Sequence, residues 1–157
     1  GRGTTLTALG ADSATRRYTI SHVGDSRAYL LRDALLTRLT KDDTWVQARV
    51  DEGLFDEAQA RAHPYAHLLS QCIGLPTPPE PHVYRGEIRE GDTFLLCTDG
   101  LTGQINDDEL LALLTEGLGQ ETNRSTVERT AEVLVRAANA AGGRDNITVA
   151  LVAPDVG

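Results

Sequence analysis

The N-terminal part of the chain alternates between short apolar runs and turn-forming residues. Each run is rich in Thr, Ile, Val, Tyr or Leu, and Gly, Asp and Ser separate one run from the next. This pattern is typical of β-strands. Because the links are short, we expect sequential strands that pair as an antiparallel meander. The expected strands cover residues 4–9, 17–23, 26–32 and 35–39.

After the fourth run, the hydrophobic spacing changes from the period of a strand to that of a helix. Asp42 or Asp43 can cap the start of this helix, and Gly53 can end it. A helix-spaced tryptophan is more often a packing anchor than a ligand platform, and we interpret Trp45 in that way. The apolar residues at helical spacing are Trp45, Val46, Val50 and Leu54.

A second short helix is expected at residues 57–62, between a capping Asp56 and a terminating Pro64. The two helices would form a subdomain or flap that separates two groups of strands. Residues 74–81 hold four prolines in eight positions, so we expect a loop there.

The second half of the chain combines strand and helix patterns. Asn106 followed by Glu109 resembles a capping box in front of a Leu-rich helix. Residues 125–128 form another capping box, and the helix behind it would end at Gly142-Gly143. The expected fold class is therefore α+β, in one domain of residues 1–157. The remaining strands are expected at residues 82–88, 92–98 and 146–152.

Composition narrows the function. The chain has 157 residues, no methionine and a formal net charge of −8. The missing methionine indicates part of a larger protein, and the acidic balance argues against a nucleic-acid partner, which needs clustered Lys and Arg. With no membrane-length apolar run and no secretion signal, we expect a cytoplasmic domain. Cys72 and Cys97 are too few and too far apart for a zinc ribbon, so we interpret both as buried thiols.

Three aspartates share one setting: each stands at the end of an expected strand, beside a small or turn-forming residue. They are Asp25, Asp99 and Asp145. If the three converge, their charges repel unless a cation neutralises them, and oxygen ligands of this kind suit Mg²⁺ or Mn²⁺. Each aspartate taken alone also fits an ordinary turn or cap residue.

Two histidines offer a different metal site. His63 and His67 are four residues apart, a spacing that places two imidazoles on one helical face and could bind zinc. Pro64 between them weakens the helix, and the glutamate of a metalloprotease motif is missing. We therefore favour flap histidines without a ligand role.

Five motifs in order carry a resemblance to a known family. They are GTTLTA (3–8), HVGDSRAY (22–29), LTKDD (39–43), CTDGLT (97–102) and GRDNITV (143–149). Together they resemble the metal-dependent protein phosphatases of type 2C, the PPM class, and in particular bacterial Ser/Thr phosphatases that oppose receptor-type kinases. The resemblance covers essentially the whole chain.

This resemblance implies two antiparallel sheets flanked by helices, a four-layer sandwich that would be incomplete here. It also implies that about residues 42–67 form a flap beside the cleft. It implies two or three Mg²⁺ or Mn²⁺ ions per complete site and attack of a metal-bound water on phosphoserine or phosphothreonine. The expected partner is a phosphoprotein, the substrate of a bacterial Ser/Thr kinase.

The resemblance also implies roles for individual residues. Asp99 and Asp145 match core metal ligands, and Asp25 matches the ligand of a third, weaker metal that it shares with Asp99. Asn146 would support the Asp145 loop by hydrogen bonding. The supporting residues beside the ligands are Gly100 and Gly24.

One departure from the family stands out. Its members carry an Asp-Gly-x-Gly-Gly motif whose aspartate bridges two metals, and an upstream arginine that grips the phosphate; neither has a counterpart in these residues. We therefore expect the chain alone to be a poor phosphatase. We also expect uncovered sheet surface, which a separate segment or a second copy could cover. Two alternatives stay open: a non-catalytic module that binds a kinase or phosphoprotein, and a plain metal-binding or assembly fragment.

Overall fold

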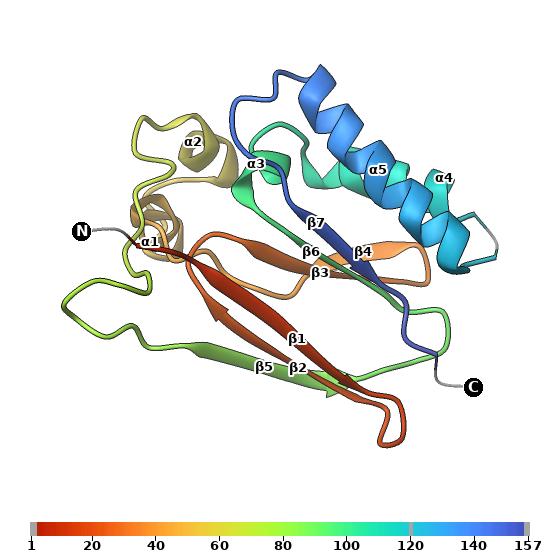
Figure 1. Cartoon of the computed structure of the whole chain (residues 1–157). Coiled ribbons are helices and arrows are strands. Elements are labelled where there is room, and N and C mark those ends of the chain that lie inside the picture. The colour runs from red at the N-terminus through yellow and green to blue at the C-terminus, as the bar shows by residue number, and fades with distance from the viewer. Residues whose placement is uncertain (1–2, 120, 156–157) are drawn as a thin grey trace.

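The computed structural model describes residues 3–119 and 121–155. Strands open and close the chain, and helices occupy two stretches between them (Figure 1). The elements are β1 Leu6–Asp12, β2 Arg17–Val23, β3 Arg27–Arg32, β4 Leu35–Arg38, α1 Trp45–Asp51, α2 Glu57–Ala62, β5 His82–Glu87, β6 Thr93–Cys97, α3 Asp99–Thr102, α4 Asp107–Leu118, α5 Arg124–Ala140 and β7 Val149–Val152.

The strands form two antiparallel sheets, with orders β1-β2-β5 and β4-β3-β6-β7. The hairpins β1–β2 and β3–β4 confirm the short antiparallel links predicted from the sequence. The continuous meander is wrong, because β2 and β3 lie in different sheets. Between them Gly24 has a φ of +108°, a conformation that favours glycine and that turns the chain from one sheet into the other.

The pattern of burial explains why β3 leaves the first sheet. On β2, burial alternates through Tyr18 and Ile20, as in a strand covered on one face. On β3, the consecutive residues Ala28, Tyr29 and Leu30 are all buried. Consecutive burial requires cover on both faces, and β3 has helices on one side and the three-stranded sheet on the other (Figure 1).

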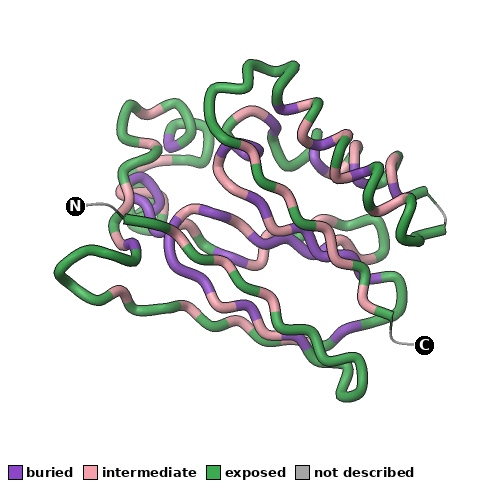
Figure 2. The backbone as a smooth tube through the Cα atoms, viewed as in Figure 1, coloured by how far each residue is buried: buried purple, intermediate pink, exposed green. Residues whose placement is uncertain are grey.

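Helices, the four-stranded sheet and the three-stranded sheet are stacked as three layers (Figure 1). Buried residues follow β2, β3 and β6, while the peripheral loops are exposed (Figure 2). This confirms two antiparallel sheets with helices outside. On the outward side of the three-stranded sheet, Leu6 and Val83 are 48% and 46% exposed. The core between the sheets contains Tyr18, Ile20, Ala28, Leu30, Ile88 and Phe94, and the core beneath the helices contains Tyr29, Leu95, Cys97, Leu101, Ile105, Leu110, Leu114, Leu134 and Ala138.

The two short flap helices, α1 and α2, lie together at one end of the molecule (Figure 1). The Asp56 cap of α2 is confirmed, since its side chain accepts a hydrogen bond from the Gln59 amide. For α1 the cap is Thr44, so the prediction of Asp42 or Asp43 is wrong. Both aspartates are engaged elsewhere, Asp42 with a guanidinium and Asp43 with a main-chain amide and a histidine.

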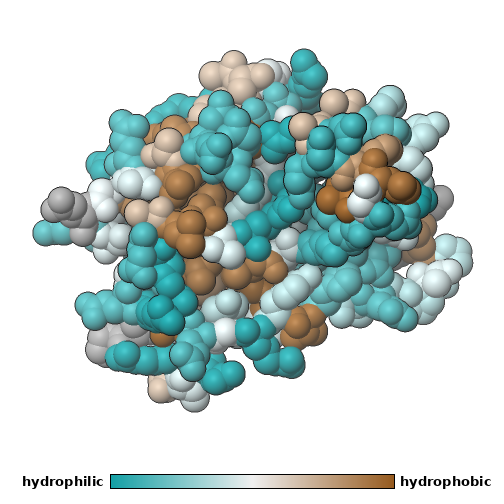
Figure 3. All heavy atoms as spheres, turned by 180° about the vertical axis from the view of Figure 1, so that it is seen from behind, coloured by the Kyte–Doolittle hydropathy of each residue, from teal (hydrophilic) through white to brown (hydrophobic). Residues whose placement is uncertain are grey.

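Trp45 is confirmed as a packing anchor within the flap. Its ring lies 6.1 Å from that of Phe55, 5.2 Å from that of His63 and 5.8 Å from that of Tyr65. The guanidinium of Arg49 lies 4.9 Å from the centre of the Trp45 ring. Seen from behind, hydrophobic side chains gather in separate patches among hydrophilic ones (Figure 3).

The C-terminal helices confirm one capping box and correct another. Asn106 and Glu109 cap α4 reciprocally, as predicted. The box of α5 lies two residues before the predicted one, because Asn123 and Thr126 form it. Glu128 instead binds Arg124, at 2.8 Å. The short α3 was not predicted from the sequence. None of the described helices combines the length and apolar character that a bilayer crossing requires.

Both cysteines are free and buried, as predicted. Burial raises the pKa of the Cys97 thiol to about 12. A thiol that stays protonated at neutral pH is a poor nucleophile and a poor metal ligand, so Cys97 serves packing.

Candidate metal centre

Asp25 and Asp99 lie at the same end of β3 and β6, the two inner strands of the four-stranded sheet. In the antiparallel ladder of β3 and β6, Arg27 pairs with Cys97. Asp25 precedes Arg27 by two residues, and Asp99 follows Cys97 by two residues. Continuing the register therefore places the two carboxylates opposite each other.

His67, from the flap, completes a group of three possible ligands. One ligand atom each from Asp25, His67 and Asp99 lies within 4.8 Å of the other two. His67 Nδ1 is 3.6 Å from Asp99 Oδ2, and the imidazole is 73% exposed. Carboxylate oxygens and an imidazole nitrogen at this spacing suit a divalent cation.

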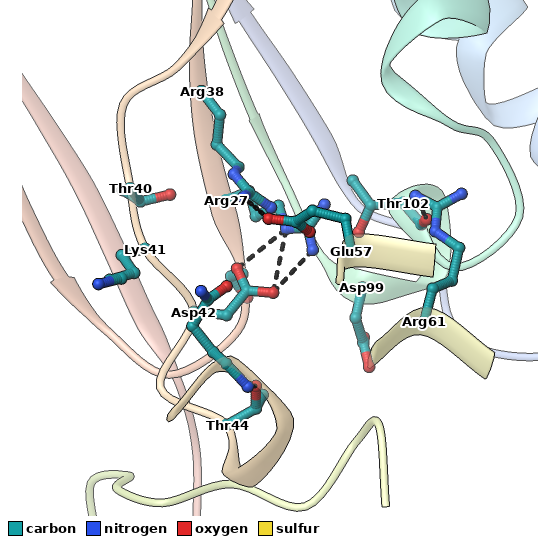
Figure 4. A network of polar contacts seen from close by, with 12 residues as sticks. Arg27, Arg38, Thr40, Lys41, Asp42, Thr44, Glu57, Arg61, Asp99 and Thr102 are labelled. Atoms are coloured by element: carbon teal, nitrogen blue, oxygen red, sulfur yellow. Dashed lines mark hydrogen bonds and ion pairs between the residues drawn. The ribbon is translucent and has the colours of Figure 1, made fainter. Parts of the chain in front are cut away.

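These three residues line a cavity of about 560 Å³ between this end of the sheet and the flap. Figure 4 shows charged side chains from both walls facing this space. Arg27 is held by Asp42, with Nη2 to Oδ2 at 2.7 Å and Nε to Oδ1 at 2.9 Å. Arg38 contacts Glu57 at 3.4 Å, and Arg61 donates to the Thr102 carbonyl at 3.4 Å. The cavity is therefore lined by polar and charged side chains.

The electrostatics of the cavity fit a cation. Burial, together with the negative charges of Asp99 and Asp42, raises the pKa of Asp25 to about 6. A carboxylate whose charged form is disfavoured by its neighbours lacks a compensating positive charge. A divalent ion between Asp25 and Asp99 would supply that charge, so the donor set and the local field agree.

Asp145 does not join this group within the described residues. It lies on the exposed loop before β7, and its Oδ1 accepts a 2.7 Å hydrogen bond from the Asn146 amide. The structure thus brings together two of the three aspartates named from the sequence and holds the third on a neighbouring loop.

The Asp145 loop is nevertheless joined to the Asp99 segment. A Cβ atom on Gly100 would overlap the main-chain carbonyl of Asn146. The Thr98 hydroxyl donates to the same carbonyl at 3.2 Å, and the Thr148 amide donates to that hydroxyl at 3.0 Å. Asn146 therefore supports the loop through its main chain.

Gly24 fixes the other loop of the site. A Cβ atom there would overlap the side chain of Thr5, and the positive φ disfavours any other residue. The Gly24 amide donates to Asp43 Oδ2 at 2.8 Å, and the Asp43 amide donates to the Gly24 carbonyl at 2.8 Å. These bonds tie the residue before Asp25 to the start of the flap.

Comparison with known proteins decides the family. The chain is 41% identical over 149 residues to the Ser/Thr protein phosphatase PstP of Mycobacterium tuberculosis, covering 95% of this chain and 27% of that protein. It is 35% identical over 156 residues to the Ser/Thr phosphatase Stp of Listeria monocytogenes, covering 99% and 58%. A crystal structure of the PstP catalytic domain in complex with two manganese ions matches with a TM-score of 0.77 and 39% identity, covering 95% of this chain and 57% of that one. The chain belongs to the type 2C protein phosphatase family.

The match is to part of the relatives only. The chain spans between 27% and 58% of the lengths of these phosphatases. No protein-family model matches the sequence. The resemblance stated from the five motifs is confirmed, and what the whole phosphatase does is taken up below as a proposal.

His67 is the residue that sequence reasoning missed. We assigned no ligand role to the flap histidines, and His67 lies against Asp99. The alternative pairing of His63 with His67 finds no support, because the His63 ring packs at a tilt against Trp45 and Phe55 and lies outside the group. No local motif marks His67, since only the folding of the flap onto α3 brings it to the carboxylates.

Proposed function

We propose that the chain supplies part of the metal centre and the flap of a phosphatase that hydrolyses phosphoserine and phosphothreonine in proteins. The observation that carries the proposal is the convergence of Asp25 and Asp99, with His67 beside them, in a charged cavity. Membership of the type 2C family supports it, because the relatives matched are Ser/Thr protein phosphatases.

In this proposal, Asp99 and Asp145 are core ligands, and Asp25 and Asp99 share a further cation. Two or three Mg²⁺ or Mn²⁺ ions would occupy a complete site; the two manganese ions of PstP support a divalent cation without deciding between the metals. When bound, such a cation lowers the pKa of a water ligand and so provides the nucleophile.

The chain's own residues hold the loops that carry the proposed ligands and balance charge on the cavity wall. Gly24 and Gly100 hold the loops that carry Asp25 and Asp99, and Asn146 holds the loop of Asp145. Asp42 neutralises Arg27, and the ion pair between them holds the two side chains in place on the cavity wall.

The proposed substrate is a phosphoprotein of a bacterial Ser/Thr kinase, and the proposed location is the cytoplasm. The half-exposed outward face of the three-stranded sheet is proposed as the surface through which the chain associates with a separate segment or a second copy.

Phosphate release from a phosphothreonine peptide tests the function. We expect Asp99→Asn in the protein that contains this chain to reduce the Mn²⁺-dependent rate at least about 100-fold, since a ligand of the catalytic metal is lost. Asp108→Asn, which removes an exposed carboxylate outside the cavity, is the control. Binding of the phosphopeptide without turnover in the wild type would favour the non-catalytic module instead.

A further inference from the structure

His67 is held in place by the main chain on both sides. The Trp45 amide donates to the Leu68 carbonyl at 2.8 Å, and the Ser70 amide donates to the Asp43 carbonyl at 2.9 Å. The Ala66 amide donates to the His63 carbonyl at 2.9 Å. The segment that carries the imidazole is therefore tied by main-chain hydrogen bonds to other parts of the flap.

The ligand atoms of Asp25, His67 and Asp99 lie slightly farther apart than they would around a bound ion. An octahedral ion with ligands at about 2.1 Å needs neighbouring ligands about 3 Å apart and opposite ligands about 4 Å apart. The three ligand atoms lie within 4.8 Å of one another. His67 Nδ1 lies 3.6 Å from Asp99 Oδ2, which is too far for a hydrogen bond. Side-chain rotation of the exposed imidazole can close the remaining distance.

Two polar contacts between the flap and α3 are found in the described part of the chain. One is His67 against Asp99, at the first residue of α3, and the other is Arg61 against the Thr102 carbonyl, at the last. The second contact is a long hydrogen bond of 3.4 Å, so it holds the flap only weakly. A cation bound between His67, Asp25 and Asp99 would replace this weak attachment by a cross-link.

We propose that His67 is a ligand from the flap for the cation held by Asp25 and Asp99, so that occupancy of this cation fixes the flap against α3. The proposal rests on the proposed function only in requiring that the two carboxylates bind a cation. An imidazole nitrogen suits Mn²⁺ better than Mg²⁺, so this ligand also favours manganese at this position.

Two measurements on the chain test the proposal, neither of which depends on activity. Titration calorimetry with Mn²⁺ should show that His67→Ala weakens binding at least about tenfold, with a smaller loss for Mg²⁺. Amide hydrogen exchange of residues 57–70 should slow on Mn²⁺ addition in the wild type and not in His67→Ala. His67→Asn, which keeps a polar side chain of similar size, serves if the alanine variant unfolds.

Two controls separate the ligand role from a structural one. His63→Ala removes an imidazole of the same flap outside the group, and it should leave Mn²⁺ affinity unchanged. Arg61→Gln removes the other flap contact, and it should speed exchange while keeping the slowing caused by Mn²⁺. Wild-type affinity and slowing in the His67 variants would overturn the inference and leave the proposed function standing. No Mn²⁺ binding by the wild-type chain would also overturn the inference, whereas the proposed function is decided separately by phosphate release in the protein that contains this chain.

Discussion

Gly100 packs so closely against Asn146 that a side chain on the glycine would collide with the asparagine carbonyl. Gly100 follows Asp99 and Asn146 follows Asp145, so this contact joins the two segments that carry the proposed core ligands. The relative position of the two carboxylates thus depends on a residue without a side chain.

Gly100→Ala should therefore lower the free energy of unfolding by about 1–3 kcal/mol, the usual cost of forcing a methyl group into a packed site. It should also weaken Mn²⁺ binding, because the Asp145 loop must move. Urea unfolding and calorimetry check the two effects. Gly10→Ala is the matched control, since its nearest contact would be 3.9 Å and its residue is exposed. Equal losses at the two glycines would contradict the account.

The ion pair of Arg32 and Asp92 should contribute more to the free energy of unfolding than the ion pairs on the helix surfaces. The Asp92 side chain is fully buried, and it accepts bonds from Arg32 at 2.6 Å and 2.7 Å and from the Arg89 amide at 2.8 Å. Arg32→Met leaves a buried carboxylate without its cation and should cost about 2–4 kcal/mol of unfolding free energy.

Arg124→Met is the control for that experiment. Arg124 and Glu128 are 92% and 63% exposed, so losing their pair should cost no more than about 1 kcal/mol. Urea denaturation of both variants gives the comparison. A similar small loss in Arg32→Met would show that Asp92 finds water or another partner.

His22 makes stability depend on pH. Burial lowers the pKa of this imidazole, which lies between Thr7 Oγ1 at 2.9 Å and the Lys41 carbonyl at 3.0 Å. The folded state therefore binds its proton less readily than the unfolded state, whose pKa is near 6.5. Stability from neutral His22 is fully present above that pH and is lost as the pH falls below it.

Comparing the wild type with His22→Gln isolates this contribution from the other titrating groups. The variant should be less stable at pH 8, and the gap should narrow as the pH falls to 5. Chemical denaturation at several pH values measures it. Parallel curves for the two proteins would rule out the buried neutral imidazole as the cause.

The chain alone should hydrolyse p-nitrophenyl phosphate slowly or not at all in Mn²⁺. The 157 residues contain no Asp-Gly-x-Gly-Gly motif, and a two-metal mechanism needs the carboxylate that bridges the ions. Fast turnover that Asp99→Asn abolishes would show that these residues complete the site without it.

Local sequence patterns predicted most elements because their signals are local. The Asn106–Glu109 box and the Asp56 cap depend on neighbours three residues apart, and both are confirmed. The α1 cap failed because Asp42 and Asp43 bind Arg27, Gly24 and His82, partners that only the folded chain supplies. Competition from distant partners is invisible in a local pattern.

The site was predictable in part for the same reason. Asp25 and Asp99 follow from motifs at strand ends, and the β3–β6 register brings them together. The meander failed because alternation along β2 does not say which sheet receives β3. His67 depends on how the flap folds over α3, a long-range arrangement with no periodic signal.

Calorimetric titration of the chain with Mn²⁺, in wild type and Asp99→Asn, tests the central claim most directly. Asp99 is shared by the proposed core site and by the group with Asp25 and His67, so its loss should remove most of the binding heat. Asp145→Ala should weaken binding less, and Asp108→Asn should leave it unchanged. Superimposable isotherms for the wild type and Asp99→Asn would contradict the assignment of this cavity as a metal centre.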